Sequence, residues 1–72
     1  MVYLERIKGL REDNDKSQKE LAEYLHIAQN TYSQYENGKR DLPTDCLIKI
    51  CQYYNVSADY ILGLTDRKGS LK

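Results

Sequence analysis

The chain has 72 residues, and its 11 Lys and Arg balance 11 Asp and Glu, which excludes a histone-like, polybasic mode of binding. Hydrophobic residues make up 40% and charged residues 31%, a composition typical of a small globular domain and not of a disordered chain. If the partner is a nucleic acid, the placement of the charges matters more than their sum.

Cysteine and histidine are too sparse for a metal site, and nothing in the local sequence marks a catalytic Cys–His pair. On a helix, Cys46 and Cys51 would point about 140° apart, so neither a mutual disulfide nor a shared metal is within reach. The one histidine, His26, belongs to no HxxxH pattern, and there is no CxxC pair. No hydroxyl–His–carboxylate cluster or phosphate loop indicates catalysis either. We therefore predict no metal, no cofactor and no enzymatic activity.

The N-terminal segment, MVYLERIKGLRED, has no long apolar run. It therefore predicts neither a signal peptide nor a membrane span. Two cysteines are also too few for a disulfide scaffold, which favours a reducing compartment. We expect a cytoplasmic protein without membrane association.

Apolar residues recur at helical spacing along almost the whole chain, and no strand-type alternation is present. The first predicted helix covers residues 2–13, with an apolar stripe that runs from Tyr3 to Leu10. A polar cluster at 13–16 is expected to end it.

The second and third predicted helices follow each other closely. Ser17 and Glu20 have the spacing of a capping box, which starts a helix that ends near His26. The next helix covers residues 29–37 and stops at Gly38, a residue suited to the left-handed conformation after a helix. Because only three residues separate the two helices, they are expected to cross steeply, as in a helix-turn-helix.

Two further helices complete the domain. The fourth follows Pro43, with Thr44 as its expected N-cap and an apolar stripe between residues 47 and 54. Asn55 can end it in the left-handed region. The fifth is brief and begins after Ser57.

The fifth helix ends at Gly63, and the polar residues 65–72 are expected to fray. The fold class predicted from these elements is all-α, a compact five-helix domain with helices two and three as the helix-turn-helix. We place this domain at residues 1–65 and a polar C-terminal tail at 66–72.

The third predicted helix has two distinct faces. At a spacing of i, i+4 and i+7, its inner face holds Ala28, Tyr32 and Tyr35. The opposite arc carries no charge and consists of Gln29, Asn30, Ser33 and Gln34. Amide side chains present a donor beside an acceptor, which matches the adenine edge in the major groove. The alternative is an exposed polar helix whose amides contact no partner. The composition of this face alone does not decide between the two interpretations.

Two segments beside this face favour DNA. The first is the start of the second helix, where Gln18 and the backbone amides of Lys19 and Glu20 lie at the positive end of the helix dipole. The second is the loop after the third helix, Asn37-Gly38-Lys39-Arg40, with backbone N–H groups and two positive charges. Such segments suit a phosphate backbone on either side of the amide face. Taken alone, the loop reads better as an ordinary solvated turn.

Together these motifs resemble a known family. The segments SQKELA (17–22), QNTYSQYENGKR (29–40), Pro43 and VSADYILG (56–63) are similar to the Cro-type (XRE) helix-turn-helix of phage repressors and small bacterial regulators. The resemblance covers residues 3–65. It is carried mainly by the opening and closing motifs of the helix-turn-helix at the correct separation.

The resemblance implies sequence-specific binding of double-stranded DNA, with the third helix in the major groove. By position, the residues that would read bases are Gln29, Asn30 and Gln34, with Ser33 adjacent. Those that would contact phosphates are Gln18, Lys19, Asn37, Gly38, Lys39 and Arg40. Arg11 and Glu36 match a structural ion pair between the first and third helices.

Three residues depart from the pattern of the family. His26 occupies a turn position that normally prefers Gly. Ala28 stands at the N-cap of the third helix, where Ser or Thr is preferred, at a cost of about 1 kcal/mol. Tyr32 replaces a branched aliphatic residue, so its hydroxyl needs a hydrogen-bond partner or water.

The function implied is a transcriptional regulator, more often a repressor. A homodimer, at least on DNA, would read palindromic half-sites one helical turn apart, about 34 Å. The expected dimer contact lies at Tyr60, Ile61 and Leu64. A protein-interaction module of the same fold that does not bind DNA is the alternative.

Overall fold

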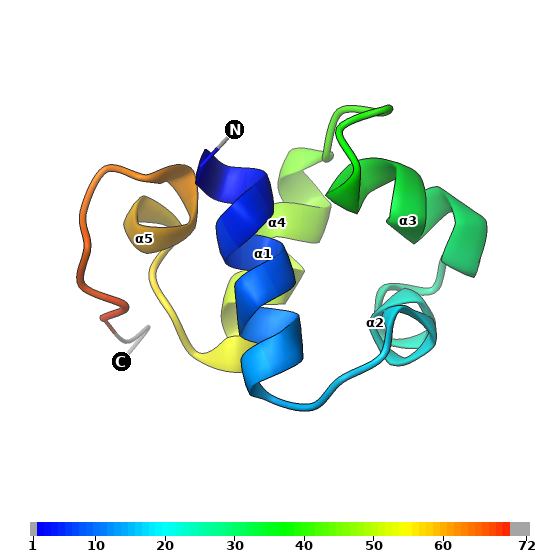
Figure 1. Ribbon diagram of the computed structural model, residues 1–72, viewed down its shortest axis with the longest axis horizontal. Helices are drawn as coiled ribbons and strands as arrows, with labels where there is room; N and C mark the ends of the chain where they lie inside the picture. Colours follow the sequence, from blue (N-terminus) through cyan, green and yellow to red (C-terminus); the bar gives the residue numbers. More distant parts are fainter. Residues whose placement is uncertain (1, 70–72) are drawn as a thin grey trace.

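The computed structural model describes residues 2–69 and is all-α over that range (Figure 1). Its helices are α1 (Val2–Asp13), α2 (Gln18–Leu25), α3 (Gln29–Glu36), α4 (Thr44–Tyr54) and α5 (Ala58–Leu62). The five-helix prediction is therefore confirmed, with boundaries within two residues of those expected. The proposed division between a domain at 1–65 and a tail at 66–72 stays a prediction.

The helices surround a core that every one of them enters. In Figure 1, α1 and α4 occupy the middle, α5 lies at one end, and α2 and α3 lie at the other. Helix α2 is seen almost end-on while α3 runs across the view, so the two cross steeply, as the short connection requires. Helix α1 packs against both α3 and α5, and it thereby joins the two ends of the molecule.

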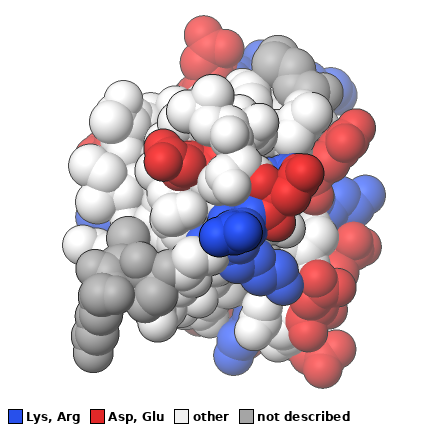
Figure 2. Space-filling view, turned by 90° about the vertical axis from the view of Figure 1, so that its left-hand side faces the viewer, with Lys and Arg blue, Asp and Glu red and all other residues white. Residues whose placement is uncertain are grey.

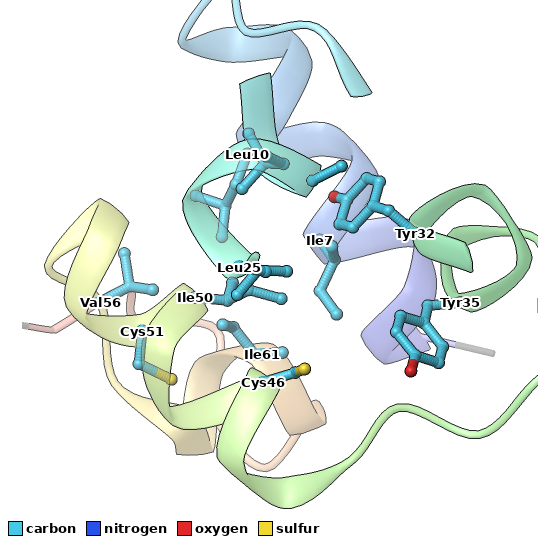
Figure 3. Packing of buried hydrophobic residues seen from close by; sticks show 12 residues of the cluster. Ile7, Leu10, Leu25, Tyr32, Tyr35, Cys46, Ile50, Cys51, Val56 and Ile61 are labelled. Carbon is cyan, nitrogen blue, oxygen red and sulfur yellow. The ribbon is translucent and has the colours of Figure 1, made fainter. Parts of the chain in front are cut away.

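The core consists mainly of aliphatic side chains, with two tyrosine rings and two thiols (Figure 3). Its members are Ile7, Leu10, Leu21, Ala22, Leu25, Tyr32, Tyr35, Cys46, Ile50, Cys51, Val56 and Ile61. Both cysteines are free, and burial raises the pKa of each thiol. They therefore act as small apolar side chains in the packing.

The helix starts follow the predicted caps with one exception. Ser17 and Glu20 form the capping box of α2, in which the Glu20 N–H donates to Ser17 Oγ over 3.0 Å. Helix α4 differs, because Pro43 is its N-cap and Thr44 is its first helical residue, so the prediction for Thr44 was wrong by one position. Pro43 has φ −63° and ψ 149°, a conformation that proline adopts readily just before a helix.

Every connection between two of the described helices has a residue in the left-handed region of the backbone, and in the α1–α2 loop it is Asp15, with φ 55°. His26, with φ 59°, closes α2, and Asn55, with φ 55°, closes α4. His26 therefore adopts the conformation for which glycine is usual at that turn. Gly38, with φ 76°, follows α3, and a Cβ atom there would lie 3.1 Å from Leu4 Cδ1. Both the conformation and the close approach of Leu4 favour glycine at position 38.

The segment after α5 is held against the domain as far as the structure describes it. The Arg6 guanidinium donates to the carbonyl oxygens of Tyr60 (2.6 Å) and Thr65 (2.5 Å) and to the Asp66 carboxylate (2.8 Å). The carbonyl of Lys68 accepts a 2.8 Å bond from the Ser57 N–H. Residues 65, 66 and 68 of the expected tail thus form hydrogen bonds with the domain, and the fraying itself stays a prediction. Residues 70–72 of the tail lie outside the described range.

Candidate nucleic-acid interface

Helix α3 is fixed by two buried rings, and its amide side chains face outward. Tyr32 is 0% exposed and Tyr35 is 8% exposed, so both rings lie in the core (Figure 3). On the other side, Gln29 and Asn30 are exposed, whereas Ser33 and Gln34 are half-buried. The four residues form one uncharged surface along α3, which we call the amide face.

Ala28 departs from the helical wheel. It was assigned to the inner face, but it is exposed and lies before the helix begins. Its backbone is extended, with φ −68° and ψ 146°, and no side chain caps the first turn of α3. The wheel failed there because an N-cap residue does not have helical dihedral angles.

The Tyr32 hydroxyl is fully buried and has no hydrogen-bond partner among residues 2–69. Its polar neighbour is the Glu36 carboxylate. Burial raises the pKa of this phenol, and the neighbouring Glu36 carboxylate raises it further. Both effects keep the hydroxyl in its neutral form.

Arg11 and Glu36 form a buried ion pair between α1 and α3. Arg11 Nε lies 2.9 Å from Glu36 Oε2, and Arg11 Nη2 lies 3.0 Å from Oε1, a two-pronged arrangement. Burial alone would raise the pKa of the Glu36 carboxyl, but hydrogen bonds, that from Arg11 foremost, hold it below its ordinary value. Arg11 Nη1 also donates to the Lys16 carbonyl over 2.9 Å, so the pair reaches the α1–α2 loop.

The start of α2 offers backbone donors. The N–H of Glu20 is used by Ser17, but those of Gln18 and Lys19 have no acceptor in the described part of the chain. Lys19 is exposed beside them, and the ammonium group of Lys16 lies 3.8 Å from the Glu20 carboxylate, a long ion pair. Open N–H groups at the positive end of a helix dipole suit a phosphate oxygen.

The loop after α3 differs from the expectation in one respect. The N–H groups of Asn37, Gly38, Lys39 and Arg40 all donate to carbonyls of α3. Two of these bonds converge on the Gln34 carbonyl, from Lys39 at 2.9 Å and from Arg40 at 3.3 Å. The expected backbone donors are therefore committed to closing the end of the helix, where carbonyls lack partners.

What the loop presents to a partner is side chains. Lys39 and Arg40 are exposed, and neither forms an ion pair within the described residues. Asn37 Nδ2 donates to Ser33 Oγ over 3.2 Å, which joins the loop to the amide face. Two unpaired positive charges thus lie beyond the C-terminus of α3, while the open N–H groups lie at the start of α2.

One contact in this region had no signal in the sequence. Gln18 Nε2 donates to Glu36 Oε1 over 3.3 Å, although 18 residues separate them. The spacing of Gln18 indicated only its place at the helix start. Its partner could be found only once α2 and α3 were placed relative to each other.

The described residues form neither a metal-binding cluster nor a membrane-spanning helix. Between residues 2 and 69, no three His, Cys, Asp or Glu side chains gather in a way that could hold a metal ion. None of the described helices has both the length and the apolar character to cross a membrane.

The chain belongs to the helix-turn-helix family, whose model matches residues 7–61. It is 40% identical over 65 residues to the uncharacterized HTH-type transcriptional regulator YobD of Bacillus subtilis, a match that covers 90% of this chain and 58% of YobD. It is 48% identical over 58 residues to the HTH-type transcriptional regulator ImmR of the same organism, covering 81% of this chain and 46% of ImmR.

A third relative comes from a phage. The cryptic phage CTXphi transcriptional repressor RstR of Vibrio cholerae is 29% identical over 55 residues, which cover 76% of this chain and 50% of RstR. The chain thus spans about half the length of these relatives. They support the resemblance to regulators that the motifs indicated, and the names of all three describe regulators of transcription.

Proposed function

We propose that this chain binds double-stranded DNA in a sequence-specific manner, with α3 in the major groove. The observation that carries the proposal is the amide face, which projects from a helix whose opposite side is fixed by Tyr32 and Tyr35. Gln29, Asn30 and Gln34 would read base edges, with Ser33 beside them. A good bidentate amide–adenine pair discriminates by about 1–3 kcal/mol.

Phosphate contacts would flank this face. At the start of α2, the donors are the N–H groups of Gln18 and Lys19 together with their side chains. Beyond α3, the Lys39 and Arg40 side chains would contact the backbone, with Asn37 and Gly38 shaping the loop. These contacts would position the domain, and the amide face would provide the specificity.

Bound in this way, the protein would regulate transcription in the cytoplasm, by occupying an operator as a repressor. The regulators to which it is similar support this role, and RstR is named as a repressor. These three relatives are named as regulators and not as enzymes, in agreement with the lack of catalytic motifs in the sequence.

A homodimer on palindromic half-sites would extend the contact to two successive turns of the groove. The exposed apolar residues Val2, Ile48, Leu62 and Leu64 support an interface near α5, and Leu64 is 74% exposed. Figure 2 shows that end of the molecule, where uncharged atoms occupy one side and charged residues gather on the other. Ile61 cannot contribute as expected, because it is 0% exposed and packs in the core.

The test of DNA binding is a selection of duplexes from a random pool, followed by a salt titration of the selected duplex. Affinity should fall steeply with rising salt, because phosphate contacts release counterions. Sedimentation with and without the duplex would report the dimer. Recovery of no enriched sequence, or an affinity that salt does not change, would contradict the proposal.

A further inference from the structure

The Glu36 carboxylate is a junction between the elements that carry the proposed DNA contacts. Its side chain is 2% exposed, and it accepts hydrogen bonds from Arg11 and from Gln18. Glu36 ends α3, whereas Gln18 begins α2. Glu36 therefore connects the end of α3, which carries the amide face, with the start of α2, which carries the open N–H groups.

The bond to Glu36 restricts the Gln18 side chain. A carboxylate only accepts hydrogen bonds, so it fixes which end of the Gln18 amide faces it. One N–H of that amide points to Glu36 Oε1 over 3.3 Å, and the second N–H remains for another acceptor. Gln18 is half-buried, so this end of the side chain is still within reach of a ligand.

Holding a flexible side chain in place before binding removes part of the entropy cost of binding. Arg11 contributes to the same arrangement, because it holds Glu36 from one side and the Lys16 carbonyl from the other. The backbone leading to Gln18 and the acceptor for its side chain are thus fixed by one network.

We infer that Glu36 is a positioning residue for DNA binding, which orients the Gln18 amide to donate to a backbone phosphate. This inference rests on the proposed function. It assigns to Glu36 a role beyond the ion pair with Arg11, and that role is exerted through Gln18.

A double-mutant cycle on the full chain tests the coupling. The affinity for the selected duplex is measured at pH 8 for wild type, Gln18→Ala, Glu36→Met and the double variant. Loss of a hydrogen bond to a charged phosphate should weaken wild-type binding by about tenfold on Gln18→Ala. In the Glu36→Met background the same substitution should cost less than about threefold, because the amide is no longer held.

Arg11→Met is the matched control. It breaks the same ion pair and destabilises the fold, but it leaves the carboxylate that accepts from Gln18. Gln18→Ala should therefore keep more of its effect in the Arg11→Met background than in the Glu36→Met background. Glu36→Gln should also preserve it, since the new amide retains an acceptor oxygen. Lys39→Ala, in the other phosphate-binding segment, should weaken binding by a similar factor in every background.

The inference is overturned if Gln18→Ala weakens binding equally in the wild-type and Glu36→Met backgrounds, or if it has no effect in wild type. Absence of binding by the wild-type protein would instead contradict the proposed function, so the two failures are distinguishable. Should Glu36→Met not fold, the wild-type protein still provides a test. Its Gln18 side-chain amide protons should exchange more slowly than those of the exposed Gln29, and equal rates would reject the inference.

Discussion

Helix α4 is held in the core by apolar groups, whereas α3 depends on polar ones. The buried residues of α4 are Cys46, Ile50 and Cys51. Those of α3 are Tyr32, Tyr35 and Glu36, and each of them carries a polar atom. The three buried residues of α4 therefore pack without specific partner atoms, and the polar atom that the helix buries is the hydroxyl of its last residue, Tyr54. Helix α3 is oriented by the ion pair with Arg11 as well as by its rings, which makes its position sensitive to charge.

The ends of α3 and α4 also differ, in their charges and caps. Helix α4 has Asp45 in its first turn, which is favourable to the helix dipole. Helix α3 has no acidic residue in its first turn, no basic residue in its last and no side-chain cap. A carboxylate at the start of α3 would stabilise the helix but would repel a DNA phosphate. The local stability that α3 lacks is provided by its contacts with α1 and α2.

The largest effect is expected from Ile50→Ala in α4. Ile50 is 0% exposed, and truncation of such a residue lowers the free energy of unfolding by about 2–5 kcal/mol. Denaturant unfolding followed by circular dichroism measures the loss. Ile48→Ala is the control on the same helix, since Ile48 is 52% exposed and should change the stability by less than about 0.5 kcal/mol. Equal losses for both variants would mean that α4 is not packed as described.

Substitutions in the amide face should change DNA binding and leave the stability of the fold unchanged. Gln34→Ala and Gln29→Ala should each reduce the preference for the selected duplex over an unrelated one by about 1–3 kcal/mol. Lys39→Ala or Arg40→Ala should instead weaken both duplexes alike and reduce the salt slope by about 1. Fluorescence anisotropy at several salt concentrations separates the two patterns. If the glutamine variants unfold, the outward placement of the amide face is wrong.

As the pH falls, the packing of α3 should weaken before the packing of α4. The pKa of Glu36 is lowered in the folded protein, since its hydrogen bonds outweigh the effect of burial. Its contribution to stability is therefore complete above the ordinary carboxyl pKa, about 4.3, and is lost as the pH falls through the lower folded value. The unfolding free energies of wild type and of the Arg11→Met/Glu36→Met double variant, compared from pH 7 to pH 2, measure this loss.

The difference in unfolding free energy between wild type and the double variant should change only below about pH 4.3. The control is Lys16→Ala, which breaks an exposed pair with a 3.8 Å separation and should follow the wild-type pH profile. Parallel curves for wild type and the double variant would show that Glu36 titrates normally and does not stabilise α3 as a carboxylate.

Local patterns in the sequence were enough to predict the helices and the orientation of α3. The capping box at Ser17, the left-handed residue Asn55 and the spacing of Tyr32 and Tyr35 depend on a few neighbouring residues. Such short-range rules hold because they concern backbone groups and faces of one helix. The fold could be predicted for the same reason.

The features that the sequence could not predict depend on which of several possible neighbours a group contacts. The N–H groups of Lys39 and Arg40 were expected to face phosphates, but the Gln34 carbonyl captures them. Ile61 was expected in an interface, but the core buries it completely. In each case the residue type allowed both outcomes. Closure of the end of α3 decided the first, and packing against the other helices decided the second.

The smallest effect is expected where α3 begins. Ala28 has the extended backbone of an N-cap residue but no side chain that can accept from the first turn, so Ala28→Ser should raise the free energy of unfolding by about 1 kcal/mol. Thermal unfolding of the two proteins measures the gain. A serine hydroxyl is uncharged, so DNA affinity and its salt dependence should stay within twofold of wild type, or about 0.4 kcal/mol.

Ala28→Asp is the matched variant that separates stability from binding. It should stabilise the helix to a similar degree, because aspartate caps as well as serine and complements the helix dipole. Its negative charge at the start of α3 should, however, weaken binding to every duplex. If aspartate left the affinity unchanged, the start of α3 would not face DNA, and the absence of acidic residues there would have no bearing on function.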